Sequence, residues 1–407
     1  MKTTWPILLA LLTLSSCKFS FDKAKVEDSY GSVEEPSCDP SLIDPSQSTL
    51  SVDSPTVDAD GSSVSTITFT LLNCNSQGVA GITPTFSVSG TQNSPLPCSV
   101  TDTAGMSTCT LSSTHAETKS IEATSPALIA YDPVESTGLS TSVEFTIPAL
   151  ELNLKACLAG AVPVLGPPLP MNAGIYLPSI SPFAGSSTWY TNEPPAVHDL
   201  VGTEVDWVLV QLYDYSTSQF VDAKSAVLHR DGSITLPAGA AGGTITFDSS
   251  VLNPDYSTKY ALNIIHRNHL PIGLDDTDPD NLISRTNTTI DFTLTNTEYL
   301  GQTGTTSSDP YDLVNPTTKC LRAGNFNNDF IIDSQDKTDM KTYVDALTGL
   351  DSQLNNIVLN GYFTTDMNLN GQTKLYVGGV ENEDLVGVDV MTGPTTIPIP
   401  IWNNGAP

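Results

Sequence analysis

Val57-Asp-Ala-Asp-Gly-Ser-Ser-Val-Ser-Thr-Ile-Thr-Phe-Thr-Leu71 is the stretch that decides the fold class of this 407-residue chain. Its second half alternates apolar and polar residues, which places Ile67, Phe69 and Leu71 on one face of an extended segment. Successive side chains of a strand point to opposite faces of a sheet, so the alternation predicts a strand with one buried face. Short segments up to residue 150, separated by polar turns, repeat the pattern and predict a β-sandwich. Their apolar positions are Phe86 and Val88, Cys109 and Leu111, and Val143, Phe145 and Ile147.

The composition excludes one class of partner and favours another. The chain has 45 acidic and 16 basic residues, a net charge of −29 and a pI near 4.1. Binding to nucleic-acid phosphates requires clustered Lys and Arg, so we expect no nucleic-acid partner. A divalent cation suits this charge better. Long amphipathic stretches are missing and turn-forming residues abound, so the fold class is expected to be mainly β.

The first β segment resembles a known family. Residues 57–71 are followed by Gly78-Val-Ala-Gly81, Thr101-Asp-Thr-Ala-Gly105 and Cys109-Thr-Leu-Ser-Ser113. Together these phrases resemble the bacterial Ig-like domain of the invasin and intimin type, called Big-1. The resemblance implies an Ig-like β-sandwich over residues 48–150, and in such proteins the domain usually serves as a stalk and less often as the binding tip.

The N-terminus is typical of an exported protein. Residues 1–17 contain one early charge and then an apolar run too short to span a bilayer as a mature helix, which indicates a signal peptide. Leu14-Ser15-Ser16-Cys17 resembles a bacterial lipobox, which implies lipidation of Cys17 and an N-terminal membrane anchor. Lys18 then fits sorting to the outer membrane; the alternative is a cleaved soluble signal. Residues 18–47 are polar and Pro-containing and are expected to form a flexible linker.

Six further cysteines predict up to three disulfides in an exported chain. Residues 98–109 form an expected hairpin that turns at Thr103-Ala104 and sets Cys98 opposite Cys109. Cross-strand cysteines can bridge at that separation, although buried free thiols remain the alternative. The remaining pairing stays open for Cys38, Cys74, Cys157 and Cys320.

A second β-rich block covers residues 151–300 and is expected to form a second β-sandwich-like domain. Val205-Asp-Trp-Val-Leu-Val-Gln-Leu-Tyr213 is its predicted central strand, and Asp231-Gly232 marks a tight hairpin turn. The order of its phrases resembles an uncharacterised β module that precedes dockerin-like calcium repeats in secreted bacterial proteins. These phrases are Leu177-Pro, Pro182-Phe, Val205-Asp-Trp-Val-Leu-Val, Leu228-His-Arg-Asp-Gly232 and Ile265-His-Arg-Asn-His-Leu270.

Two other features of this block have competing interpretations. His266 and His269 invite a zinc interpretation, but side chains three apart on a strand point to opposite faces, so we interpret both histidines as structural. Trp189 and Tyr190 lie in a Ser- and Pro-rich loop and are either core residues or an exposed platform for a sugar.

After a linker at residues 301–317, Asn325-Phe-Asn-Asn-Asp-Phe-Ile-Ile-Asp-Ser-Gln-Asp336 has the ligand order of an EF-hand calcium loop. Asn325 in place of Asp at the first position and Phe330 in place of Gly at the sixth weaken the match, so we expect affinity in the extracellular range of about 0.1 to 1 mM. A helix capped by Ser334 or Asp336 should follow and end at Gly349. The expected ligands, at positions 1, 3, 5, 7, 9 and 12, are Asn325, Asn327, Asp329, the carbonyl of Ile331, Asp333 and Asp336.

A second loop begins at Asp366-Met-Asn-Leu-Asn-Gly371, with ligands predicted at Asp366, Asn368 and Asn370. Its twelfth residue is Val377, which cannot coordinate, so a longer loop would be closed by Glu381, Asn382 or Asp384. Two such loops resemble a dockerin pair, which implies a small α-helical calcium module over residues 318–407.

No nucleophile elbow, zinc-protease helix or phosphate-binding glycine loop occurs in the sequence, so we expect no enzyme. The sequence predicts a lipid-anchored surface protein with structural Ca²⁺ sites that acts in adhesion or cell-surface assembly. A surface protein or a glycan is the expected ligand. The alternative is a carbohydrate-binding or carbohydrate-processing component, for which a cleft lined by exposed aromatic rings and a carboxylate pair would be the sign.

Overall fold

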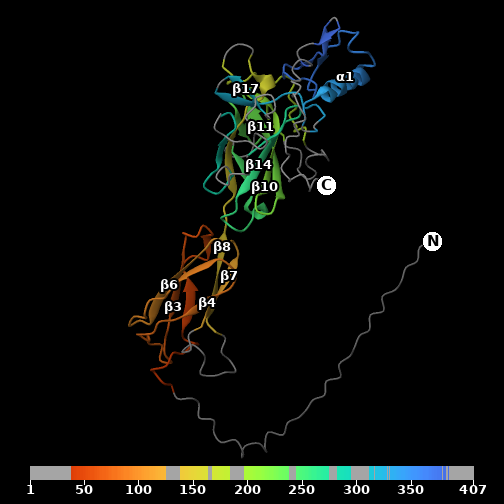
Figure 1. Cartoon of the computed structure of the whole chain (residues 1–407). Coiled ribbons are helices and arrows are strands. Elements are labelled where there is room, and N and C mark those ends of the chain that lie inside the picture. Colours follow the sequence, from red (N-terminus) through yellow and green to blue (C-terminus); the bar gives the residue numbers. More distant parts are fainter. Residues whose placement is uncertain are drawn as a thin grey trace, which may run out of the picture.

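The computed structural model describes residues 38–124, 138–163, 167–183, 197–237, 244–274, 282–294 and 311–384, except 316, 328, 330, 378, 382 and 383. Two β domains follow one another along a rod, and a small module with helix α1 lies beside the far end of the second (Figure 1). Cys17, the rest of the expected leader, and Trp189-Tyr190 lie outside the described residues.

The first domain is a sandwich of two four-stranded sheets, ordered β1-β3-β6-β5 and β2-β8-β7-β4. The alternating stretch forms β3, where Ile67 and Phe69 are fully buried and pack with Leu111 and Phe145 from the two sheets. The pleat therefore places its apolar face in the core as predicted. The strand bounds are β1 Thr49–Val52, β2 Thr56–Asp58, β3 Ser65–Thr70, β4 Phe86–Val88, β5 Asn93–Leu96, β6 Met106–Ser113, β7 Thr118–Ala123 and β8 Ser140–Thr146.

Three disulfides join the six described cysteines. Cys98 and Cys109 are bonded with their Cα atoms 4.2 Å apart, next to a turn in which the Gly105 N–H donates to Asp102 O. The other two bonds are Cys38–Cys74 and Cys157–Cys320. The last of these spans 163 residues, so it ties the start of the second domain to a strand that directly precedes the terminal module.

The second domain is built on an eight-stranded sheet ordered β13-β9-β12-β11-β10-β14-β15, with β16 parallel to β9. Every residue of β10 is buried, because alternate side chains enter separate cores on the two faces of the sheet. Val208 and Val210 face the main core, whereas Trp207 and Leu209 face a smaller one. The bounds are β9 Leu150–Lys155, β10 Glu204–Asp214, β11 Gln219–His229, β12 Ser233–Thr235, β13 Ile245–Phe247, β14 Tyr260–Ile265, β15 Ile272–Gly273 and β16 Thr289–Asp291, with 3-10 helices η2 Ala159–Ala161 and η3 Ser249–Val251.

The two domains are joined by backbone contacts as well as by the chain between β8 and β9. The Ala116 N–H donates to Pro254 O at 2.8 Å, and the Tyr256 N–H donates to Thr114 O at 2.8 Å. The Gln92 side-chain amide adds a bond to Asp255 Oδ2 at 2.8 Å. A loop of the second domain is thus fixed on the end of the first, which restricts bending at the junction.

The terminal module follows the hairpin of β17 Tyr311–Asn315 and β18 Thr318–Leu321. Helix α1, Ser334–Thr348, is the only α-helix of eight or more residues in the described part of the chain. Asp333 caps its start, so the expected cap at Ser334 or Asp336 is wrong, although Asp336 completes a capping box with Asp333. Gly349, with φ of 70°, ends the helix in the left-handed conformation, as the sequence predicts. Short strands complete the module: β19 Leu359–Asn360, β20 Gln372–Thr373, β21 Tyr376–Val377 and β22 Val380–Glu381.

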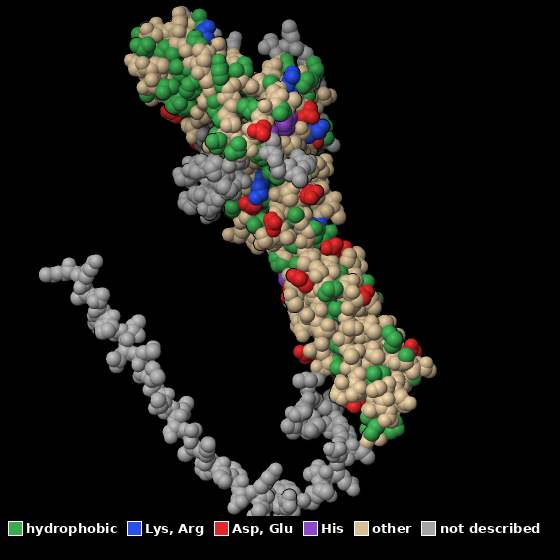
Figure 2. Space-filling view, turned by 180° about the vertical axis from the view of Figure 1, so that it is seen from behind, with side chains coloured by type: hydrophobic (Ala, Val, Ile, Leu, Met, Phe, Trp, Pro, Cys, Tyr) green, Lys and Arg blue, Asp and Glu red, His purple; other side chains and the backbone are tan. Residues whose placement is uncertain are grey.

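A small apolar cluster holds the module against the second domain. Met340 and Val344 of α1 pack with Met367 and with Leu270, which belongs to the second domain. Several larger apolar side chains of the module remain exposed and gather on one of its faces (Figure 2). They are Tyr343, Leu347, Leu350, Leu354, Val358, Val377 and Val380. No described helix is long and apolar enough to cross a membrane.

Candidate functional site: two closed loops on a buried dock

Asp336 folds back over the first loop and holds it closed. Its Oδ1 accepts from the N–H groups of Phe326 at 2.8 Å and Asn327 at 3.3 Å, and its Oδ2 accepts from the Asp333 N–H at 2.8 Å. The side chain is fully buried. The carboxylate at the twelfth position therefore bonds the second, third and ninth residues of the loop.

The other side-chain oxygens of the first loop differ in whether a hydrogen-bond donor reaches them. Asn325 is 2% exposed, and its Oδ1 has no hydrogen-bond donor among the described residues. Asn327 Oδ1 accepts from the Asp329 N–H at 3.0 Å, and Asp329 Oδ1 accepts from the Ile331 N–H at 2.9 Å. A buried oxygen without a donor is costly, and a cation would satisfy it. Phe330, at the sixth position, lies outside the described residues.

The second loop turns tightly around Asp366. Its two carboxylate oxygens accept from the N–H groups of Asn370 at 3.1 Å and Gly371 at 2.8 Å. Asn368 Oδ1 also accepts from the Asn370 N–H, at 3.2 Å, and Asn370 Oδ1 accepts from the Gln372 N–H, at 2.8 Å. Gly371 has φ of 79°, the left-handed turn that glycine permits at the sixth position.

Asp384 is the residue that closes the second loop. Its Oδ1 accepts from the Met367 N–H at 3.0 Å and its Oδ2 from the Lys374 N–H at 2.7 Å. Met367 and Lys374 are the second and ninth residues counted from Asp366, the same positions that bind Asp336 in the first loop. Of the other two candidates, Glu381 pairs instead with Lys337 at 2.9 Å on the surface, and Asn382 lies outside the described residues.

The closing carboxylates are poorly stabilised as anions by the chain alone. Burial raises the pKa of Asp336 to about 6. Burial also raises the pKa of Asp366 to about 6, and the pKa of Asp384 to about 7 with a further contribution from the Asp366 charge. In the described part of the chain no three His, Cys, Asp or Glu side chains form a metal cluster, so amide and carbonyl oxygens would have to complete each site. Hard oxygens of this kind suit Ca²⁺, and the residues present fit that ion.

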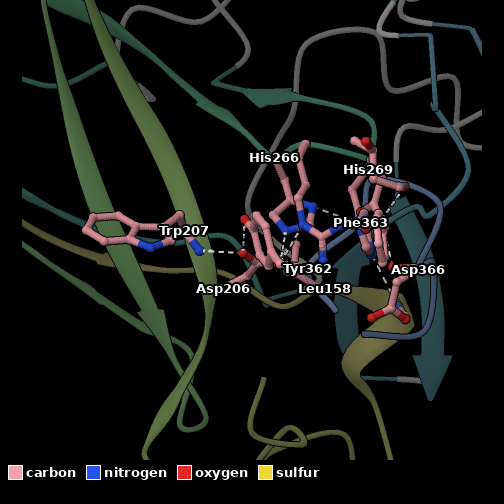
Figure 3. Close-up of polar contacts among 12 residues, drawn as sticks. Leu158, Asp206, Trp207, His266, His269, Tyr362, Phe363 and Asp366 are labelled. Carbon is pink, nitrogen blue, oxygen red and sulfur yellow. Dashed lines mark hydrogen bonds and ion pairs between the residues drawn. The ribbon is translucent and has the colours of Figure 1, made fainter. Parts of the chain in front are cut away.

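Both loops rest on the segment that follows β14. We call residues 266–270 of this segment, together with Asp206 of β10, the dock. Asp206 is 1% exposed and lies beside His266 and Tyr362 (Figure 3). The Arg267 Nε donates to Asp206 Oδ2 at 2.9 Å, and the Tyr362 hydroxyl of the module donates to Oδ1 at 2.6 Å. The Arg267 guanidinium also lies over the Tyr362 ring, 4.2 Å from its centroid, and donates to Phe363 O.

The charges of the dock compensate one another. Burial alone would raise the pKa of Asp206, but the Arg267 charge, with a further contribution from the adjacent His266 ring, holds that pKa well below its usual range. Burial and the Asp206 charge together raise the pKa of the Tyr362 hydroxyl well above its usual value. Asp206 is therefore an anion paired with Arg267, and Tyr362 is a neutral donor to it.

The expectation that His266 and His269 point apart is wrong. Strand β14 ends at Ile265, so both residues lie beyond the strand and their rings meet with centroids 4.6 Å apart. The Gly160 N–H donates to His269 Nε2 at 3.2 Å, which places the His269 proton on Nδ1, 2.9 Å from His266 Nδ1. His266 Nε2 then faces Asp206 Oδ2 at 3.1 Å. The His266 Nε2 contact with Asp206 is an ion-pair distance without hydrogen-bond geometry. No third metal-ligating side chain joins the pair among the described residues, which agrees with the structural interpretation.

The dock itself was not predicted from the sequence. One signal was present: Asp206 is a carboxylate inside an otherwise apolar strand, where a charge needs a partner. Its partners lie about 60 and 156 residues further along the chain, so spacing alone does not identify them.

Two hollows in the described surface bear on the sugar hypothesis. One, of about 320 Å³, is lined by Glu117, Glu144 and Phe145 near the junction of the domains, but Phe145 is only 1% exposed. The other, of about 440 Å³, is lined by residues of β9, β12 and β16 and contains no aromatic side chain. Neither hollow presents the exposed ring on which a sugar would stack.

Comparison with known proteins assigns the first domain. Residues 47–137 match the family described as bacterial Ig-like domain (group 1), in agreement with the two-sheet sandwich. The match covers this domain and not the rest of the chain. A search of the curated proteins found no match.

Solved structures show only distant likeness. The Yersinia pseudotuberculosis adhesin InvE is 16% identical, with 55% of this chain and 56% of that chain covered and a TM-score of 0.22. Invasin, described as a bacterial integrin-binding protein, is 16% identical, with 60% and 59% covered and a TM-score of 0.24. The Escherichia coli adhesin FdeC is 12% identical, with 56% and 60% covered and a TM-score of 0.23. This chain thus spans less than two thirds of each, and scores this low do not define its overall fold or function.

Proposed function

We propose that this protein is a lipid-anchored, non-enzymatic cell-surface stalk in which Ca²⁺ holds the terminal module folded, and that it acts in adhesion or cell-surface assembly. The observation that carries the calcium proposal is the shared geometry of the two loops. In each, a buried carboxylate bonds the second and ninth residues of the loop, although the loops differ in length.

Calcium would act on these loops by neutralising buried charge. Asp366 and Asp384 repel one another, and Asp336 is buried with a raised pKa. A divalent cation would remove that repulsion, and Asn325 Oδ1 is placed to supply a ligand at the first position. Because only the folded module presents these oxygens together, bound calcium would stabilise it by mass action.

Two features support the stalk. The first domain matches a bacterial Ig-like family, and its end is fixed to the second domain by the contacts of Ala116 and Tyr256. The resemblance of residues 14–17 to a lipobox supports the anchor, from which residues 18–47 would lead to the first domain. Neither described hollow favours the carbohydrate alternative.

The calcium proposal is tested with the full chain lacking its signal peptide. Thermal unfolding is measured by circular dichroism with EDTA, with 5 mM CaCl₂ and with 5 mM MgCl₂ as the control for ionic strength. At about ten times the expected dissociation constant, calcium should contribute about 1.4 kcal/mol to the stability of the module. Identical melting curves in all three conditions, with no heat of calcium binding, would refute the proposal.

The anchor has a separate test. Cys17→Ser should shift the protein from the membrane fraction to the soluble fraction of the expressing cell. A variant that stays equally membrane-bound would contradict the lipid anchor and leave the calcium proposal untouched.

A further inference from the structure

Asn268 of the dock contacts the start of both loops. Its backbone carbonyl accepts from the Gly324 N–H at 2.9 Å, one residue before the first loop. Its side-chain Nδ2 donates to the carbonyl of Asp366 at 2.9 Å, the first residue of the second loop, and to Thr364 O at 3.1 Å. Asn268 is fully buried. One residue of the second β domain therefore touches both elements that would bind calcium.

The orientation of the Asn268 amide is fixed by the histidine pair. Its Oδ1 accepts from His269 Nδ1 at 2.8 Å, so Nδ2 must point to the carbonyls of the second loop. His269 is in turn held by Gly160 and by His266, which faces Asp206. The Asn268 amide is thus oriented by contacts that lead from Asp206, on the fully buried strand β10, through His266 and His269.

Packing next to Asn268 leaves the second loop little room to shift. A Cβ at Gly160 would lie 1.9 Å from Met367 O, so the domain backbone and the loop backbone are in direct contact. Leu270 belongs to one buried apolar cluster with Met367 of the second loop and with Ile332, the eighth residue of the first loop. Movement of either loop would therefore disturb contacts of the other.

We infer that Asn268 is a positioning residue for calcium in both loops, so that calcium binding is coupled between the loops and depends on the second β domain. The inference rests on the proposed calcium function and extends it. Asn268 contributes no ligand; it acts through the Asp366 and Gly324 backbones. Groups that hold metal ligands in place typically change metal affinity by 10- to 100-fold when removed.

The two loops are coupled because both must become ordered against the same dock before they bind calcium. A loop that binds calcium must first adopt its folded backbone, which costs conformational entropy. When one loop is ordered by calcium, the dock is already in place, so ordering the other loop costs less. Linkage requires that the effect be the same in both directions.

The test uses the full chain without its signal peptide and CaCl₂ as the only ligand, measured by isothermal titration calorimetry. Each loop is observed alone by removing the closing carboxylate of the other, with Asp336→Asn or Asp384→Asn. Asn268→Ala should weaken the second loop at least tenfold, and the first loop less, because its contact is to the Asn268 backbone. Asn287→Ala is the matched control, since that amide donates to Leu282 O at 3.1 Å in the same domain. It should change neither affinity.

Coupling is measured by comparing affinities with and without the partner loop. With Asn268 present, Asp384→Asn should weaken calcium binding by the first loop about fivefold, near the lower limit of typical coupling. With Asn268→Ala, the same carboxylate change should have little effect. A merely structural role for Asn268 would lower the melting temperature without changing this dependence.

The possible outcomes separate the two proposals. Absence of calcium binding in the wild-type chain overturns the calcium function and this inference with it. Binding in the wild type with unchanged affinities in Asn268→Ala overturns the inference alone. Should Asn268→Ala fail to fold by circular dichroism, Gly160→Ala decides the question, because its new Cβ would lie 1.9 Å from Met367 O and 3.3 Å from His269 Nε2 and so displaces both the second loop and the ring that orients the Asn268 amide. Unchanged affinity of the second loop in that variant also overturns the inference.

Discussion

Asp336 and Asp384 accept hydrogen bonds from corresponding backbone N–H groups of their loops, although their sequence positions do not correspond. Asp336 comes three residues after the ninth loop residue, Asp333, and Asp384 comes ten residues after the ninth, Lys374. The extra residues of the second loop contain the β21-β22 hairpin. Closure of the loop therefore depends on a buried carboxylate reaching the second and ninth N–H groups and tolerates an insertion between them.

The equivalence predicts which carboxylate controls each site. Asp384→Asn should reduce the calcium stoichiometry of the full chain from two to one, because an amide cannot neutralise the ion and donates where the carboxylate accepts. Asp336→Asn should do the same through the first loop. Calorimetric titration with CaCl₂ checks both, and Glu381→Gln is the control because the Glu381 side chain pairs with Lys337 on the surface and bonds neither the second nor the ninth N–H group of the loop. A loss of one site in Glu381→Gln, with two sites kept in Asp384→Asn, would reverse the assignment.

The first sandwich could be predicted from the sequence because its core residues alternate with polar residues along each strand. Ile67 and Phe69 recur at the period of a strand, and the structure buries both. The end of α1 at Gly349 followed from local chemistry in the same way, whereas its start is capped by Asp333 and not by the predicted Ser334 or Asp336. These features depend on contacts between near neighbours or on a period, and both are visible in a sequence.

The dock and the closing residue of the second loop depend on information that a single sequence lacks. Asp206 contacts Tyr362 across 156 residues. The meeting of His266 and His269 depends on β14 ending at Ile265, and element ends are poorly marked by propensity. Asp336 could be recognised because it lies at the fixed twelfth position of the first loop. The hairpin inserted in the second loop removes that spacing, so three candidates for its closing residue stayed open.

The Asp206 network should make a large contribution to stability. Asp206→Ala would leave Arg267 buried and unpaired, which we expect to cost about 3 to 5 kcal/mol. Tyr362→Phe removes one bond to a charged group and should cost about 1.5 to 3 kcal/mol. Urea unfolding measures both. Lys337→Ala, which breaks a surface ion pair with Glu381, is the control and should cost at most about 1 kcal/mol. If all three variants cost at most about 1 kcal/mol, the dock does not hold the module.

The buried histidine pair predicts a dependence on pH. Burial lowers the pKa of His266 and lowers that of His269 well below 6.5. Below pH 6.5 the unfolded chain binds protons that the folded chain does not, so the pair loses stability as the pH falls. The loss approaches about 1.4 kcal/mol per pH unit for each histidine. Urea unfolding at pH 7.5, 6.5 and 5.5 should show a smaller loss in His269→Gln than in the wild type. The carboxylates of the loops contribute equally to both proteins and cancel in the difference. Parallel pH profiles would show that the His269 ring takes up a proton in the folded state.

The junction between the domains predicts a stiff stalk that one backbone group can loosen. Ala116→Pro removes the N–H that donates to Pro254 O, and the neighbouring bond from Tyr256 to Thr114 O lies on the same pair of segments. We expect the variant to bend at the junction, because the Gln92 to Asp255 bond that remains is exposed to water. Small-angle X-ray scattering should then give a shorter maximum dimension and a broader distance distribution than the wild type. Ala116→Ser is the matched control, since it alters the side chain and keeps the N–H. A wild-type scattering curve from Ala116→Pro would mean that the chain between β8 and β9, with its apolar packing, sets the angle between the domains, and that the paired loops only cover the joint.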